Sequence, residues 1–79
     1  MNLLKLKEYH DGTLVYEYQP EGKGESGEVL FDIANMQGRL LKKAADDSPA
    51  SGYGQKALLK VEELVQRNNI PIQCTQAWY

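Results

Sequence analysis

Residues 3–19 read LLKLKEYHDGTLVYEYQ, and this stretch decides the expected fold. Apolar and polar residues alternate on both sides of a central His-Asp-Gly, which is typical of two half-buried strands joined by a tight turn. A two-residue turn would mix polar and apolar residues on both faces. A three-residue loop, His10-Asp11-Gly12 with Gly12 in a left-handed conformation, avoids this mixing and pairs Leu6 with Tyr16. We therefore expect the three-residue loop, with an apolar face made of Leu4, Leu6, Leu14, Tyr16 and Tyr18.

A second hairpin is expected downstream, because residues 28–33 alternate with Val29, Phe31 and Ile33 on one face. The four residues 35–38 form a plausible loop, with Gly38 supplying a positive φ. The resulting pairs are Ile33 with Leu40, Phe31 with Lys42, and Val29 with Ala44. In this register Leu40 faces the core and Leu41 faces outward, and a one-residue slip would exchange them.

The sequence between Asp46 and Pro71 predicts one helix. Asp46-Asp47-Ser48-Pro49 is typical of a helix start, with Ser48 as the cap. Gly52 and Gly54 weaken the first turns, so the ordered helix is expected to begin near Tyr53. Two asparagines followed by Pro71 indicate its end. Apolar residues recur at helical spacing and predict a buried stripe of Tyr53, Ala57, Leu58, Val61, Leu64 and Val65.

Residues 72–79 alternate weakly and predict a last strand with Pro71 at its start. This strand pairs either antiparallel with the first strand or parallel with the fourth, and antiparallel pairs are commoner. Cys74 is expected to be a small half-buried side chain. The aromatic pair Trp78-Tyr79 either packs onto the rim of the core or anchors a partner.

Together these elements predict a single α+β domain over residues 1–79. It consists of a four-stranded antiparallel meander, one C-terminal helix packed on one face, and a short final edge strand. A chain of 79 residues, 42% of them apolar, can bury one core with a thin margin of stability. Self-association is one common remedy for such a margin.

Charge and composition exclude several classes of function. Nine basic and eleven acidic residues give a net charge of −2, which argues against nucleic-acid binding. A single cysteine makes no internal disulfide, so a reducing compartment and the cytoplasm are expected. We expect no membrane association, since no apolar run reaches the length of a signal peptide or a membrane span.

Two apparent motifs carry no chemistry. Gly22, Gly24 and Gly27 satisfy GxGxxG, but a dinucleotide site needs a helix after the glycines, and residues 28–33 read as a strand. A kinase glycine loop needs further segments for which this chain has no room. His10 lies in a turn with no nucleophile nearby, so no catalytic residue, metal site or cofactor is expected.

The leading expectation is a non-enzymatic protein–protein interaction or self-association module, with a second copy or another protein as its partner. Apolar residues left outside the core, together with the terminal aromatics, define the expected partner surface. This surface consists of Val15, Leu30, Leu41, Leu59, Trp78 and Tyr79. The alternative is a small-ligand or anion-binding domain that uses the helix start or a glycine-rich loop. That loop contains Gly22, Lys23, Gly24, Ser26 and Gly27.

Overall fold

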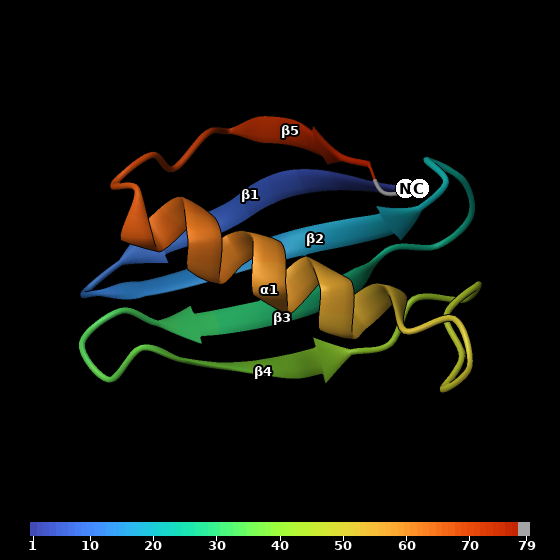
Figure 1. Ribbon diagram of the computed structural model, residues 1–79, viewed down its shortest axis with the longest axis horizontal. Helices are drawn as coiled ribbons and strands as arrows, with labels where there is room; N and C mark the ends of the chain where they lie inside the picture. Colours follow the sequence, from blue (N-terminus) through green and yellow to red (C-terminus); the bar gives the residue numbers. More distant parts are fainter. Residues whose placement is uncertain (78–79) are drawn as a thin grey trace.

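A computed structural model describes residues 1–77 and has an α+β fold in which one helix lies across a five-stranded sheet (Figure 1). The strands are β1 (Asn2–His10), β2 (Thr13–Pro20), β3 (Gly27–Asp32), β4 (Gln37–Lys42) and β5 (Gln73–Gln76), and the helix is α1 (Tyr53–Gln66). Neighbouring strands are antiparallel, in the order β4-β3-β2-β1-β5. The predicted meander, covering helix and final edge strand are confirmed.

The first hairpin has the predicted pairing but a different turn. Leu4 faces Tyr18 and Leu6 faces Tyr16, as expected. The connection is the two-residue turn Asp11-Gly12, with φ of 53° and 74°, so the expected three-residue loop is wrong. A bulge between Leu6 and Glu8 holds the extra residue instead. A bulge changes the register by one residue just as a longer loop does, which is why the apolar face is still correct.

The second hairpin is paired in a different register from the expected one. Val29 pairs with Leu40 rather than with Ala44, a shift of four residues along β4. The chain turns earlier than expected, over residues 33–36, and Met36 rather than Gly38 takes the positive φ, of 49°. Because the shift is an even number of residues, Leu40 still lies on the face that α1 covers.

The helix begins at Tyr53 as expected, with Gly52 as its N-cap residue, and its first amides are capped by the side chain of Asp47 and not by that of Ser48. The Asp47 Oδ1 atom accepts the Tyr53 N–H, and Oδ2 accepts the Gly54 N–H, both at 3.0 Å. Residues 48–52 form a separate turn, closed by a 3.0 Å hydrogen bond from the Gly52 N–H to the Ser48 carbonyl. The cap expected at Ser48 is therefore wrong, because the carboxylate one residue earlier reaches both amides.

The chain after α1 follows the sequence prediction closely. Asn68 takes a left-handed conformation, and the Asn69 N–H donates to the Leu64 carbonyl at 3.0 Å, which ends the helix. The last strand then pairs antiparallel with β1, with Cys74 facing Leu4. Of the two pairings left open by the sequence, this is the one that forms. Within residues 1–77, no helix is both long and apolar enough to cross a membrane.

The core lies between α1 and the sheet face that it covers. Its two largest side chains, Tyr16 and Tyr18, are fully buried, and burial raises the pKa of each phenol to about 12. The Tyr16 hydroxyl donates to the Pro71 carbonyl at 2.6 Å. The Tyr18 hydroxyl accepts the Ala44 N–H at 3.0 Å and donates to Asp47 at 2.7 Å. The buried cluster comprises Leu4, Leu14, Tyr16, Tyr18, Val29, Phe31, Ala44, Ala57, Val61 and Leu64.

Candidate interaction surface

The apolar residues expected to form a partner surface do not lie together. Val15 and Leu30 face each other across β2 and β3, on the sheet face away from α1. Val15 is only 5% exposed and Leu30 is half-buried, so they offer little accessible surface. Leu41, at 43% exposed, follows the last regular pair of β4, and Leu59, at 66%, lies on α1. Trp78 and Tyr79 lie outside the described residues.

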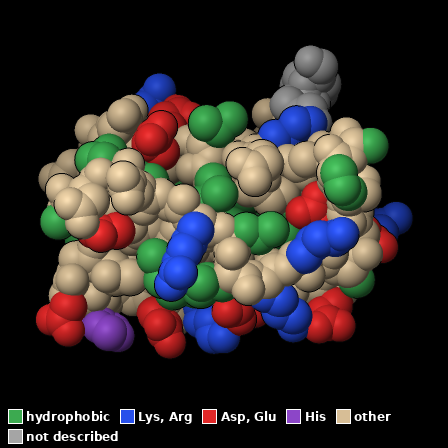
Figure 2. Space-filling view, turned by 90° about the horizontal axis from the view of Figure 1, so that it is seen from below, with side chains coloured by type: hydrophobic (Ala, Val, Ile, Leu, Met, Phe, Trp, Pro, Cys, Tyr) green, Lys and Arg blue, Asp and Glu red, His purple; other side chains and the backbone are tan. Residues whose placement is uncertain are grey.

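The sheet face away from α1 is predominantly charged. Lys5, Glu17, Glu28 and Lys42 face one another in turn across β1, β2, β3 and β4. Lys7 joins this row through a 2.6 Å ion pair with Glu28. Figure 2 views the molecule from the β4 side and shows acidic and basic side chains alternating along one margin. Such a face is well hydrated, and the apolar patch expected there does not form.

The edge strand β4 is exposed along its whole length. All six of its residues are exposed, and no strand within residues 1–77 pairs with its outer side. Its pairing with β3 is regular from Gln37 to Leu40, and a bulge follows before Lys42. Lys42 is held by a 2.6 Å ion pair with Glu25. The bulge and Lys42 hinder strand addition at one end of the edge, while the regular part, from Gln37 to Leu40, stays accessible to a partner.

Hollows border β4 on both faces of the sheet. On the α1 side, two hollows of about 190 and 280 Å³ share Gln55. On the other side, a hollow of about 300 Å³ is lined by residues that include Gly38 and Arg39. We call the feature on the α1 side the β4–α1 groove, and define it by Gly38, Leu40, Lys43, Gln55, Leu59 and Glu62.

The β4–α1 groove depends on Gly38. A Cβ atom at this position would lie 2.8 Å from Leu58 and 3.0 Å from Phe31. Glycine therefore allows the helix to lie close to β4 and leaves the neighbouring leucines to line the groove. In Figure 2, hydrophobic side chains lie between charged ones on this side of the molecule. The result is an apolar floor with charged flanks, the arrangement typical of protein interfaces.

Two charged residues of the groove are unpaired. Neither Lys43 nor Glu62 makes an ion pair with any residue from 1 to 77. They line different hollows: Lys43 lines the one that contains Leu40, and Glu62 the one that contains Gly38. Because β4 and α1 run in opposite directions along the groove (Figure 1), Glu62 lies toward the start of β4 and Lys43 lies beyond its end.

The glycine-rich loop between β2 and β3 is held by hydrogen bonds of its own backbone. The Gly22 N–H donates to the Gln19 carbonyl at 3.0 Å, and the Lys23 N–H donates to the Pro20 carbonyl at 3.1 Å. Gly24 lies against Asp46, whose carboxylate would be 2.9 Å from an added Cβ. These contacts occupy amides and supply negative charge, and both effects disfavour an anion.

The remaining residues of that loop serve packing. Ser26 is half-buried, and Gly27 is buried in β3. A Cβ atom at Gly27 would lie 2.3 Å from the ring of Tyr18 and 2.5 Å from the Lys42 carbonyl. Gly27 is therefore required because a tyrosine ring and a neighbouring strand occupy the space of a side chain.

The start of α1 is occupied by a carboxylate of the chain itself. Besides its two backbone hydrogen bonds, Asp47 accepts hydrogen bonds from Tyr18 at 2.7 Å and from Ser51 at 3.3 Å. Burial alone would raise the pKa of the Asp47 carboxyl, but the hydrogen bonds from Tyr18, Gly54, Tyr53 and Ser51 outweigh it and lower that pKa. The positive end of the helix is thus already neutralised by Asp47.

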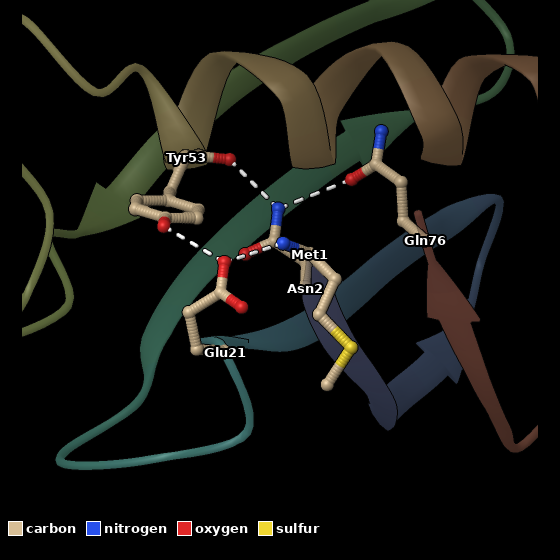
Figure 3. Close-up of polar contacts among 5 residues, drawn as sticks. All are labelled: Met1, Asn2, Glu21, Tyr53 and Gln76. Carbon is tan, nitrogen blue, oxygen red and sulfur yellow. Dashed lines mark hydrogen bonds and ion pairs between the residues drawn. The ribbon is translucent and has the colours of Figure 1, made fainter. Parts of the chain in front are cut away.

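A polar cluster joins β1, α1 and β5 (Figure 3). Asn2 is 0% exposed, and its amide donates to the Tyr53 carbonyl at 3.0 Å and to Gln76 at 3.1 Å. The Glu21 carboxylate accepts from the Met1 amino group at 2.5 Å and from the Tyr53 hydroxyl at 2.9 Å. These two hydrogen bonds lower the pKa of Glu21. Each of the five residues in the cluster makes at least one hydrogen bond to another of them, which indicates a structural role.

One atom in that cluster lacks a partner. Asn2 Oδ1 is buried and accepts no hydrogen bond from any residue in the described part of the chain. A buried carbonyl oxygen of this kind costs roughly 1–3 kcal/mol. The side chain is retained by the two bonds of its amide nitrogen, which tie β1 to α1 and β5.

The residues with potential catalytic chemistry lie apart from the β4–α1 groove. His10 is 72% exposed beside the β1–β2 turn, with Nδ1 3.4 Å from Asp11. Cys74 lies on β5, where burial raises the pKa of its thiol. A raised pKa is the opposite of the shift that activates a cysteine. Within residues 1–77, no three His, Cys, Asp or Glu side chains are grouped to hold a metal ion.

Comparison with protein-family models, with curated proteins and with solved structures found no match to this chain. Its function must therefore be inferred from its own surface. The sequence predicted Leu59 as part of a partner surface. It did not predict Gln55 and Glu62, because polar residues on a helix do not stand out in an apolar pattern. It also placed Leu40 in the core, whereas Leu40 is partly exposed at the floor of the groove.

Proposed function

We propose that this protein is a non-enzymatic protein–protein interaction module that binds its partner along β4 and the β4–α1 groove. The observation that carries the proposal is the exposure of all six β4 residues beside hollows on both faces of the sheet. An accessible edge strand offers unpaired backbone donors and acceptors to an incoming chain, and the groove offers pockets for side chains.

The size of the hollows supports a macromolecular partner over a small ligand. Each measures about 190–300 Å³, at or below the lower limit of roughly 300–1,000 Å³ for ligand pockets. Several such hollows along one strand match a row of side chains from another protein. The two anion sites considered from the sequence are supplied with carboxylates of the chain itself, Asp46 and Asp47.

The proposal is tested by photo-crosslinking in living cells. A benzophenone amino acid replaces Leu59 in the groove, and a matched control carries it at Thr75, an exposed residue of the opposite edge strand β5. We expect a discrete crosslinked protein species from position 59 and none from position 75. Equal labelling at both positions, or none at position 59, would refute the proposal.

A further inference from the structure

We infer that the occupant of the β4–α1 groove is a second copy of this chain, related by a two-fold axis that passes close to Leu40. This inference rests on the proposed function and identifies the partner. In the dimer, the two β4 strands run antiparallel beside each other, and both helices lie on the same side of the joined sheets. The arrangement is an isologous dimer, in which each copy uses the same patch.

The unpaired charges at the two ends of the groove support a second copy. Lys43 follows Leu40 by three residues and lies beyond the bulge and the end of β4. Glu62 lies on the other side of Leu40, lining the hollow that contains Gly38. A two-fold rotation about Leu40 exchanges these ends, so Lys43 of each copy approaches Glu62 of the other. The surface is therefore complementary to itself in charge.

The apolar residues of the groove have the same symmetry. Leu40 lies at the axis and meets its own counterpart, as the central residue of a two-fold interface must. Leu59, the most exposed leucine of the described chain, lies on the flank of α1 that faces β4. A dimer would cover this side chain, whose exposure in the monomer is unfavourable. The bulge beyond Leu40 limits backbone pairing, so these side chains carry the contact.

Charge reversal tests the inference, with the mass in solution measured by sedimentation equilibrium. The wild-type chain should sediment as a dimer of the 8.9 kDa protein. Glu62→Lys and Lys43→Glu should each weaken dimerisation about tenfold, because each creates two like-charge contacts per dimer. The double variant should restore it. Glu63→Lys makes the same charge change on α1 outside the groove and should leave dimerisation within about twofold of wild type.

The outcomes separate this inference from the proposed function. A monomeric mass up to millimolar concentration overturns the second copy as partner, as does a double variant that is weaker than both single variants. If the crosslinked species from position 59 then contains a different protein, the proposed function stands without the dimer. If position 59 yields no crosslink, both fail. Circular dichroism of each variant shows that a change in mass is not caused by unfolding.

Discussion

Replacing Asp47 by alanine should destabilise this protein more than any other single change on its surface. The carboxylate accepts the N–H groups of Tyr53 and Gly54, each at 3.0 Å, and the hydroxyl of Tyr18 at 2.7 Å. It therefore connects the helix start to the centre of the sheet. Alanine removes the helix cap and also leaves the hydroxyl of a fully buried tyrosine without its acceptor.

The expected loss follows from these contacts. Loss of a helix cap costs about 1 kcal/mol, and a buried hydroxyl without an acceptor costs roughly 1–3 kcal/mol. The sum, about 2–4 kcal/mol, is a large part of the roughly 4–12 kcal/mol expected for a domain of this size. For a small domain it corresponds to a Tm lower by roughly 10–30 °C.

Urea and thermal unfolding followed by circular dichroism measure this loss. Asp46→Ala is the matched control, because Asp46 is exposed and its side chain makes no hydrogen bond to residues 1–77, so its effect should stay within about 0.5 kcal/mol. The pKa of Asp47 is lowered in the folded protein, so its contribution is present above the ordinary value of 3.8 and disappears as pH falls through the folded pKa. The reasoning is refuted if the free energy of unfolding of the Asp47→Ala variant at neutral pH lies within about 0.5 kcal/mol of the wild-type value, which is the range expected for the Asp46→Ala control.

Three further predictions concern packing and chemistry inside the fold. Gly27→Ala should lower the free energy of unfolding in urea by at least about 3 kcal/mol, since its Cβ would lie 2.3 Å from the Tyr18 ring. Gly12→Ala is the control: open space surrounds this position, and the loss should be about 1 kcal/mol. Tyr18→Phe should lower the free energy of unfolding by about 1–3 kcal/mol, because the Ala44 N–H loses its acceptor; an unchanged urea midpoint would contradict this. Cys74 should react with iodoacetamide at pH 7.5 more slowly than free cysteine, because burial raises the pKa of its thiol, and equal rates would show that the thiol is not held in the core.

The sequence predicts much of this fold because alternation and helical spacing decide which face each residue occupies. The apolar face of the first hairpin is correct even though its turn is not, since a bulge and a longer loop have the same effect on register. The stripe on α1 faces the core for the same kind of reason: Ala57, Val61 and Leu64 are buried, and Tyr53, Leu58 and Val65 are partly buried against the core.

Features that depend on distant contacts escaped prediction. The turn after β3 takes its positive φ at Met36, a residue with no preference for it, and glycine is needed at Gly38 to admit α1. The cap of α1 depends on Tyr18, which lies far away in sequence and orients Asp47. The groove was missed because its outline depends on where α1 crosses the sheet, which periodicity along one element does not report.

The pairing of β5 with β1 joins residues as far apart as Asn2 and Gln76. β5 leaves the ribosome after all the other elements, so a nascent chain that has formed its meander still presents the outer side of β1 as a second free edge. Closing that edge is a slow, non-local step in folding. Until it is complete, the free edge opposite β4 is the nine-residue β1 rather than the four-residue β5, and crowding at high expression should favour aggregation through β1.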